Sequence, residues 1–207
     1  MKLFCKQEHA NDTFWHRKFG VPVGTAIIFV LEFLQIIIIA LAIIIPVRYF
    51  LVQPFYVKGA SMEPSFYDHE YLIIDEISYR FSEPKRGETL VFRYPQDPSE
   101  FFIKRIIGLP SETVEVSNGL IIIYNSEHPN GLTLDESAYL PEDTVTPGRK
   151  KVTLGLNEYF VMGDNRDASL DSRVFGPITI DAIVGRVWLR GLPASRAGFF
   201  ESPLYNL

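Results

Sequence analysis

Residues 26–45 form an almost unbroken apolar run, and this feature limits most strongly what the chain can be. Only Glu32 and Gln35 interrupt it. As a helix the run is about 30 Å long, which matches the hydrocarbon core of a bilayer. Glu32 costs roughly 2.5–3.5 kcal/mol on insertion, whereas the fifteen Ile, Leu, Val and Phe residues together contribute roughly −7 kcal/mol. We therefore predict a transmembrane helix over residues 26–45.

Two other interpretations of the apolar run are weaker. A buried helix of a soluble domain normally keeps a polar stripe, and this run has almost none. A cleavable secretory signal has an apolar region of about 7–15 residues before a small-x-small site. Here the run is longer and passes through Pro46-Val47-Arg48 without such a site. The sequence therefore favours an uncleaved anchor.

The basic residues around the run predict its orientation. Four precede it and two follow it at a comparable distance, namely Lys2, Lys6, Arg17 and Lys18 before it and Arg48 and Lys58 after it. By the positive-inside rule, residues 1–25 lie in the cytoplasm and residues 46–207 outside, with the protein in the cell membrane as a single-pass protein. Cys5, the only cysteine, then lies on the reducing side, and an intramolecular disulfide is excluded.

The chain after the anchor has the short β-rich runs and frequent turns of a mainly β domain. The predicted strands are Tyr71–Ile74, Thr89–Tyr94, Phe101–Ile107, Thr113–Val116, Leu120–Tyr124, Glu158–Met162 and Ala182–Leu189. Asn118-Gly119, between two of them, is a strong hairpin signal. We expect a coiled antiparallel sheet or small barrel with its core at about 50–124 and 152–195. Residues 125–151, rich in turn formers, are expected to be an inserted loop or cap.

The net charge and the number and spacing of cysteines and histidines argue against several classes of function. The net charge of −5 argues against nucleic-acid binding through a basic surface. One cysteine rules out a Cys-built zinc site. The four histidines, His9, His16, His69 and His128, show no metal-ligand spacing. We therefore expect no metal and no other cofactor.

Two segments carry residues suited to chemistry. Gly59-Ala60-Ser61-Met62-Glu63-Pro64-Ser65 presents a serine among small residues, although by itself it favours an ordinary turn. In Phe101–Ile107, strand alternation places Lys104 in one row with Phe102 and Ile106. Desolvation in such a row can lower the pKa of a lysine toward the value that a general base needs. On this segment alone, an edge-strand lysine that guards against aggregation is the commoner interpretation. A Ser-His-Asp triad has less support, because His69 and His128 lie in turn-like settings.

Three motifs in order behind an anchor resemble the membrane-anchored type I signal peptidases, or leader peptidases. Residues 59–65 resemble the nucleophile motif and Phe102–Pro110 the lysine motif of that family. Gly163-Asp164-Asn165-Arg166-Asp167-Ala168-Ser169-Leu170-Asp171-Ser172-Arg173 resembles the third motif. The likeness runs from the anchor to about residue 190.

The resemblance implies a serine endopeptidase that removes signal peptides from exported preproteins. It identifies Ser61 as the nucleophile, Lys104 as the general base, and Ser169 as the residue that orients the lysine amine. Asp171 and Arg173 match a pair that supports the site. Some members have serine in place of Gly59, where the hydroxyl helps to bind the oxyanion; here the backbone N–H of Ser61 is one expected donor. Ser111 replaces a usual glycine and would be mildly strained if its turn needs a positive φ.

The expected substrate is an extended peptide whose P1 and P3 side chains point to one side. Shallow apolar pockets would select a small-x-small cleavage motif. Candidate lining residues are Phe55, Val57, Met62, Phe102 and Ile103, for each of which core packing is equally consistent. The alternatives are a soluble self-cleaving Ser-Lys protein related to SOS repressors, which would carry a helix-turn-helix instead of an anchor, and a non-catalytic anchored β module. The segment 196–207 has no role that we can predict.

Overall fold

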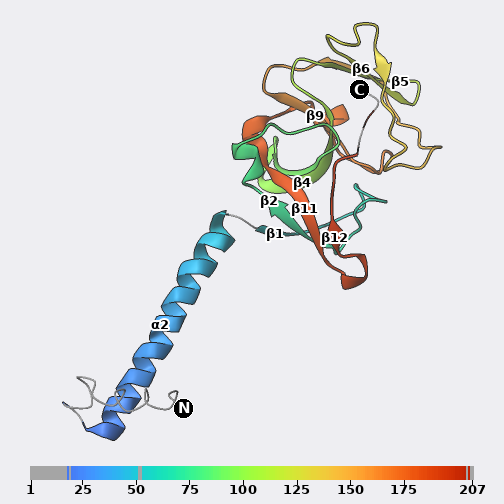
Figure 1. The fold of residues 1–207 in the computed structure, drawn as a ribbon. Helices are drawn as coiled ribbons and strands as arrows, with labels where there is room; N and C mark the ends of the chain where they lie inside the picture. Colours follow the sequence, from blue (N-terminus) through green and yellow to red (C-terminus); the bar gives the residue numbers. More distant parts are fainter. Residues whose placement is uncertain (1–17, 19, 51–52, 204, 206–207) are drawn as a thin grey trace, which may run out of the picture. The chain divides into compact units, whose positions relative to one another are not determined.

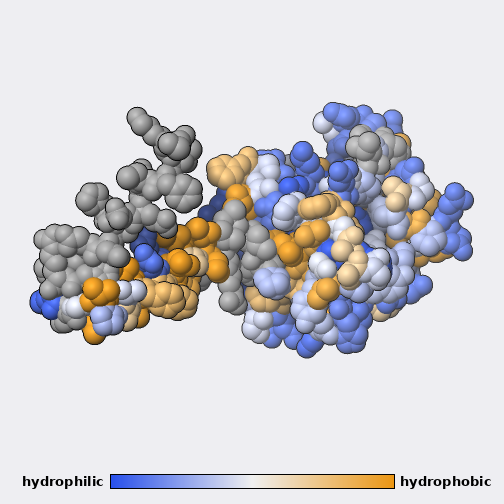
Figure 2. Space-filling view, turned by 60° about the horizontal axis from the view of Figure 1, so that its bottom comes forward, coloured by the Kyte–Doolittle hydropathy of each residue, from blue (hydrophilic) through white to orange (hydrophobic). Residues whose placement is uncertain are grey.

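The computed structural model of the chain describes residues 18, 20–50, 53–203 and 205, and it divides into two units, 1–49 and 50–207. The first unit contains helix α2, Val21–Phe50. Its apolar part, Val21–Ile45, is long enough to cross a membrane, and its surface is largely hydrophobic (Figure 2). The helix thus begins before the predicted residue 26. In the predicted N-terminal segment 1–25, residues 1–17, which include Cys5, and residue 19 lie outside the described residues.

The second unit is built mainly from short antiparallel strands (Figure 1). The strands are β1 Gln53–Tyr56, β2 Tyr71–Asp75, β3 Thr89–Tyr94, β4 Asp97–Gly108, β5 Thr113–Ser117, β6 Leu120–Tyr124, β7 Leu132–Thr133, β8 Lys150–Thr153, β9 Glu158–Met162, β10 Ile178–Thr179, β11 Ile183–Leu192 and β12 Gly198–Phe199. The helical turns are Ser78–Arg80, α3 Ser172–Phe175, Ile180–Ala182 and Ala194–Arg196. The mainly β prediction is confirmed, as antiparallel sheets rather than a closed barrel.

The larger sheet has the strand order β1-β2-β11-β3-β4-β9-β10, with β12 paired to β11. Strand β4 lies between β3 and β9, and its residues pair in register with both: Lys104 is opposite Leu90, and Arg105 is opposite Thr89 on one side and Met162 on the other. Because a strand turns successive side chains to opposite faces, Lys104 and Arg105 leave the sheet in opposite directions. Strand β4 therefore places one basic side chain on each face of the larger sheet.

The smaller sheet has the order β7-β6-β5-β8 and lies within residues 113–153. The sequence placed residues 113–124 in the core and only 125–151 in the insertion. In the structure β5 and β6 pair with β7 and β8 instead of with the larger sheet, so the insertion begins earlier. The local pattern of a strand does not say which sheet it joins, because that depends on partners distant in the chain.

The predicted hairpin between β5 and β6 is confirmed. Asn118 and Gly119 have φ of 52° and 82°, the left-handed pair that a two-residue turn of this kind requires. Ser111, at φ 67°, also adopts the left-handed conformation, in agreement with the mild strain expected there.

Three clusters of buried apolar residues make up the core of the second unit. One lies between the smaller sheet and the ends of β4 and β9 and includes Ile107, Val114, Ile123 and Phe160. The second surrounds Met62, Phe66, Leu72 and Val187, and the third surrounds Leu90, Phe92, Ile106 and Val161. The first cluster joins the insertion to the larger sheet, while the second lies under the turn that carries Ser61.

Candidate active site

The site centres on Ser61 and Lys104, which the fold brings together from segments 43 residues apart. Ser61 begins the turn 61–66 that follows β1, and Lys104 projects from β4. The Lys104 Nζ lies 2.8 Å from the Ser61 Oγ and 2.8 Å from the backbone carbonyl oxygen of Ile103. Lys104 is only 3% exposed. A serine hydroxyl and a lysine amine are therefore in hydrogen-bond contact in a site that largely excludes water.

Burial changes the acidity of the lysine. It lowers the pKa of Lys104 from 10.5 to about 8, although the carboxylates of Asp171 and Asp164 oppose the change by attraction. The ring of Phe102, whose centroid is 5.4 Å from Nζ, forms part of the surroundings. A substantial fraction of Lys104 is consequently neutral near physiological pH, so its amine has a lone pair available to accept a proton.

Asn165 holds the backbone on which Ser61 stands. Its backbone N–H donates to the carbonyl oxygen of Ser61 at 3.1 Å, and its side-chain Nδ2 donates to the carbonyl oxygen of Ala60 at 3.1 Å. Asn165, a residue of the third motif, therefore fixes the peptide groups before and after Ser61. The backbone N–H groups of Ala60 and Ser61 have no acceptor among the described residues.

Gly163 permits this close approach of the two segments. A Cβ at this position would collide with the carbonyl oxygen of Ser61 and with the Oγ of Ser169, and it would lie 2.6 Å from the Ser169 Cβ. Only glycine leaves room for both neighbours. Gly163 and Asn165 both belong to the motif quoted from the sequence, but nothing local to that segment indicated that they contact the serine turn.

Ser169 lies beside Gly163, at the back of the site. Its Oγ is buried, and among the described residues no hydrogen bond of normal geometry joins it to Lys104 or to another group. It is nevertheless close enough to Asp171 to help lower the pKa of that carboxyl group. The amine of Lys104 instead donates to Ile103 as its second partner. The orienting role expected for Ser169 therefore stays a prediction.

Asp171 and Arg173 form a buried pair behind the same segment. The guanidinium donates to both carboxylate oxygens, at 2.9 and 2.8 Å, and the backbone N–H of Gly163 donates to Asp171 at 3.1 Å. Burial alone would raise the pKa of Asp171, but the hydrogen bonds and charge of Arg173, with the N–H of Gly163, hold the pKa below its usual value. Asp171 is therefore ionised and anchors the backbone at Gly163.

A pocket of about 560 Å³ opens beside Ser61 and Lys104. Four of the five predicted lining residues contribute to it, namely Phe55, Val57, Phe102 and Ile103. Met62 does not, because it is 1% exposed and packs in the core under the serine turn. The sequence reasoning missed Tyr56, Leu72, Val91, Phe101, Ala168 and Leu170, which come from five different segments.

Gly59, where a serine was considered as a source of the second oxyanion donor, has φ 86° and open space around the position of a Cβ. Its backbone N–H donates to Asp68 Oδ1 at 3.0 Å and so is already engaged. Gly59 has no hydroxyl and its N–H is engaged, so it supplies no donor to an incoming oxygen, whereas the N–H of Ser61 has no acceptor among the described residues and is available.

Comparison with known proteins finds similarity to signal peptidases. The family described as signal peptidase, peptidase S26 matches residues 30–191. The chain is 33% identical over 184 residues to the probable signal peptidase I-1 of Synechocystis sp., covering 86% of this chain and 90% of that protein. It is 31% identical over 184 residues to signal peptidase IB of Staphylococcus aureus strain MRSA252, covering 84% and 95%. A crystal structure of a signal peptidase I from Enterococcus faecalis V583 aligns with a TM-score of 0.42 at 28% identity, covering 51% of this chain and 97% of that one.

The family match extends from within the apolar helix to the end of the larger sheet, and includes Ser61, Lys104 and the segment 163–173. The relatives exceed 30% identity over more than four-fifths of the chain. The protein therefore belongs to the signal peptidase family, peptidase S26.

Proposed function

We propose that this signal peptidase cleaves its substrate with a dyad in which Ser61 is the nucleophile and Lys104 is the general base. Family membership supports the removal of signal peptides from preproteins. The observation that carries the dyad is the 2.8 Å contact between the Lys104 Nζ and the Ser61 Oγ in a site where the lysine is buried. This is the nucleophile–base distance that acyl transfer requires.

The lowered pKa of Lys104 reduces the free energy that is needed to deprotonate it at neutral pH. With a pKa of about 8, Lys104 needs about 1.4 kcal/mol to lose its proton at pH 7. An ordinary lysine with a pKa of 10.5 would need about 4.8 kcal/mol. The difference corresponds to a rate factor of roughly 300, which is within the range that general-base catalysis contributes.

The reaction then follows from the two groups. Neutral Lys104 takes the proton of the Ser61 hydroxyl as the oxygen attacks the scissile carbonyl carbon, which forms a tetrahedral intermediate. The lysine ammonium gives that proton to the leaving amine, and an acyl-enzyme remains on Ser61. Lys104, again neutral, takes a proton from water as the water oxygen attacks the ester carbonyl carbon. The bond between that carbon and Ser61 Oγ then breaks, the lysine ammonium returns the proton to Ser61 Oγ, and the second product leaves. The free N–H of Ser61 is the proposed donor to the oxyanion.

The pocket supports selection of small side chains. It is walled by apolar and aromatic groups, with Phe55 and Phe101 in edge-to-face contact at 5.5 Å between ring centroids. An extended substrate strand presents alternate side chains to such a wall. We therefore propose cleavage after small-x-small motifs, with P1 and P3 facing the pocket and Ser61 next to the P1 carbonyl.

The apolar helix α2 and the signal peptidase I relatives support a membrane-anchored protein. We propose that residues 46–207 lie on the extracytoplasmic side of the cell membrane, where exported preproteins emerge. The support is the charge bias of the sequence across the apolar run.

Incubation of the full-length protein with a preprotein tests the function. Wild type is expected to release a mature protein whose new N-terminus follows a small-x-small motif. Ser61→Ala should release none, whereas Ser126→Ala, a change of the same type at an exposed position in the insertion, should cleave normally. Equal cleavage by wild type and Ser61→Ala, or a new N-terminus after large residues at P1 and P3, would overturn the proposal.

A further inference from the structure

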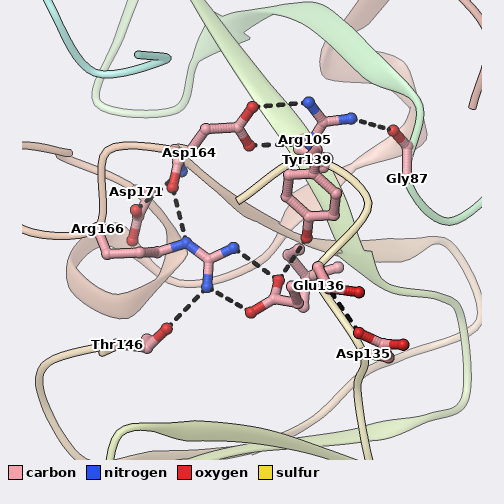
Figure 3. A network of polar contacts seen from close by, with 12 residues as sticks. Gly87, Arg105, Asp135, Glu136, Tyr139, Thr146, Asp164, Arg166 and Asp171 are labelled. Atoms are coloured by element: carbon pink, nitrogen blue, oxygen red, sulfur yellow. Dashed lines mark hydrogen bonds and ion pairs between the residues drawn. The ribbon is translucent and has the colours of Figure 1, made fainter. Parts of the chain in front are cut away.

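The loop between β7 and β8 of the insertion contributes Glu136, Tyr139 and Thr146 to a polar network around Arg105 and Arg166 (Figure 3). Arg105 leaves β4 on the face opposite to Lys104, because successive residues of a strand point to opposite faces. Arg105 projects there and makes a bidentate pair with Asp164, at 2.8 and 2.6 Å. A third bond of 2.8 Å runs from Arg105 to the carbonyl oxygen of Gly87. Asp164, which precedes Asn165 in the chain, is thus fixed by Arg105 of the larger sheet.

Arg166, the other neighbour of Asn165, is fixed by the insertion. Its guanidinium makes a bidentate pair with Glu136, at 2.7 and 2.6 Å, and donates to Thr146 Oγ1 at 2.7 Å. Its Nε donates to the carbonyl oxygen of Gly163 at 3.0 Å. Glu136 and Thr146 both lie between β7 and β8, far from the three motifs in sequence.

The Arg166 side chain is 1% exposed and that of Glu136 15% exposed. A guanidinium keeps its charge at any usable pH, so Arg166 cannot avoid the free-energy cost of a buried charge by losing a proton. Without Glu136 it would be an uncompensated buried cation, which a protein relieves by moving the side chain toward water. That movement would break the hydrogen bond from the Arg166 Nε to the carbonyl oxygen of Gly163. Gly163 lies two residues before Asn165, which fixes the serine turn.

We propose that Glu136 is a positioning residue for the active site, through which the insertion holds Arg166, and Arg166 in turn holds Gly163 and Asn165 against the Ser61 turn. The proposal rests on the proposed function of Ser61 and Lys104. Tyr139 adds a second contact of the same kind, because its ring lies 4.0 Å from the Arg105 guanidinium and its hydroxyl bonds to Glu136. The insertion thereby contacts Arg166 directly, and it also contacts Arg105, the partner of Asp164.

The test replaces Glu136 with glutamine in the full-length protein and measures kcat and KM for a signal-peptide substrate, per molecule shown to be folded by circular dichroism at the assay temperature. Glu142→Gln makes the same charge change at an exposed position of the same segment and is the matched control. We expect kcat to fall between about tenfold and a hundredfold in Glu136→Gln, with KM within about threefold of wild type, because the pocket lining does not change. Glu142→Gln should behave like wild type.

A milder variant covers the case in which Glu136→Gln does not fold. Thr146→Val keeps the size of the side chain and the ion pair but removes one hydrogen bond to Arg166, and kcat is expected to fall by about three- to tenfold. The proposal is wrong if folded Glu136→Gln, or folded Thr146→Val, has the kcat of the Glu142→Gln control. It is also wrong if the loss appears in KM alone. If Ser61→Ala retains cleavage, the failure lies instead in the proposed dyad.

Discussion

Gly163→Ala should damage catalysis by displacing the serine turn, although the substitution adds one methyl group and touches no catalytic side chain. The new Cβ would collide with the Ser61 carbonyl oxygen and the Ser169 Oγ and would lie 2.6 Å from the Ser169 Cβ. Rotation of the Ser169 side chain can move only its Oγ, because its Cβ and the Ser61 carbonyl oxygen are both fixed by the backbone. The backbone must therefore move.

The size of the effect follows from the distances. Carbon atoms in ordinary contact lie about 3.5 Å apart or more, so the Ser169 Cβ must move by about 1 Å. The Ser61 carbonyl oxygen lies closer still and must move by a comparable distance. This shift strains the hydrogen bond from the Asn165 backbone N–H to the Ser61 carbonyl oxygen. It also lengthens the distance between the Ser61 Oγ and the Lys104 Nζ. A misplacement of this size costs roughly a hundredfold in rate, or about 2.7 kcal/mol in the activation barrier.

The assay compares kcat/KM of Gly163→Ala with that of Gly198→Ala, in which the added Cβ meets nothing within 4 Å. Thermal unfolding of both variants shows the fraction folded at the assay temperature. We expect the control to match wild type and Gly163→Ala to lose roughly a hundredfold, mainly in kcat. A folded Gly163→Ala within threefold of the control would show that the contact between Gly163 and the Ser61 backbone does not position the nucleophile.

Three further predictions concern the base, the independence of cleavage from histidine and metal, and the topology. Lys104→Met should be inactive yet more stable than wild type at pH 6, by as much as about 3 kcal/mol, because the buried lysine has a pKa of about 8 when folded and 10.5 when unfolded. The unfolded state then binds more protons between these values, so the difference in urea unfolding free energy should shrink as the pH rises from 8 to 10.5; a constant difference would contradict the lowered pKa. His69→Ala, His128→Ala and EDTA should each leave most of the cleavage intact, and loss of cleavage with any of them would refute the dyad. Protease added to intact spheroplasts should digest residues 46–207, whereas their protection, with residues 1–25 accessible, would reverse the proposed orientation.

Local pattern predicted much of the β structure. Thr89–Tyr94, Leu120–Tyr124 and Glu158–Met162 have the predicted bounds because each is a short β-rich run between turn residues. Strand β8 was missed, since Lys150 and Lys151 begin it and its stability comes from pairing with β5, more than 30 residues away. The extent of the insertion was missed for the same reason.

The site was predictable where one strand determines the environment of a residue. Alternation alone indicated that Lys104 lies in one row with Phe102 and Ile106, although an edge-strand lysine was the commoner interpretation of that segment. In the structure β4 lies between β3 and β9, and Lys104 is buried. The turn geometry around Ser61 was not predictable from its sequence, so Met62 was expected in the pocket but packs into the core. The contacts of Gly163, Asn165 and Glu136 join three segments, and no local pattern reports them.

The pH dependence of kcat/KM tests the central claim, that neutral Lys104 is the base, most directly. For a signal-peptide substrate measured from pH 5 to 10, activity should rise with pH along an acidic limb whose midpoint is the lysine pKa of about 8 in the free enzyme. Lys104→Arg should retain less than about a tenth of the rate at every pH, because the guanidinium keeps its proton. An acidic limb at about 4 to 5, where ordinary carboxylates titrate, or a more active Lys104→Arg enzyme, would mean that Lys104 is not the base.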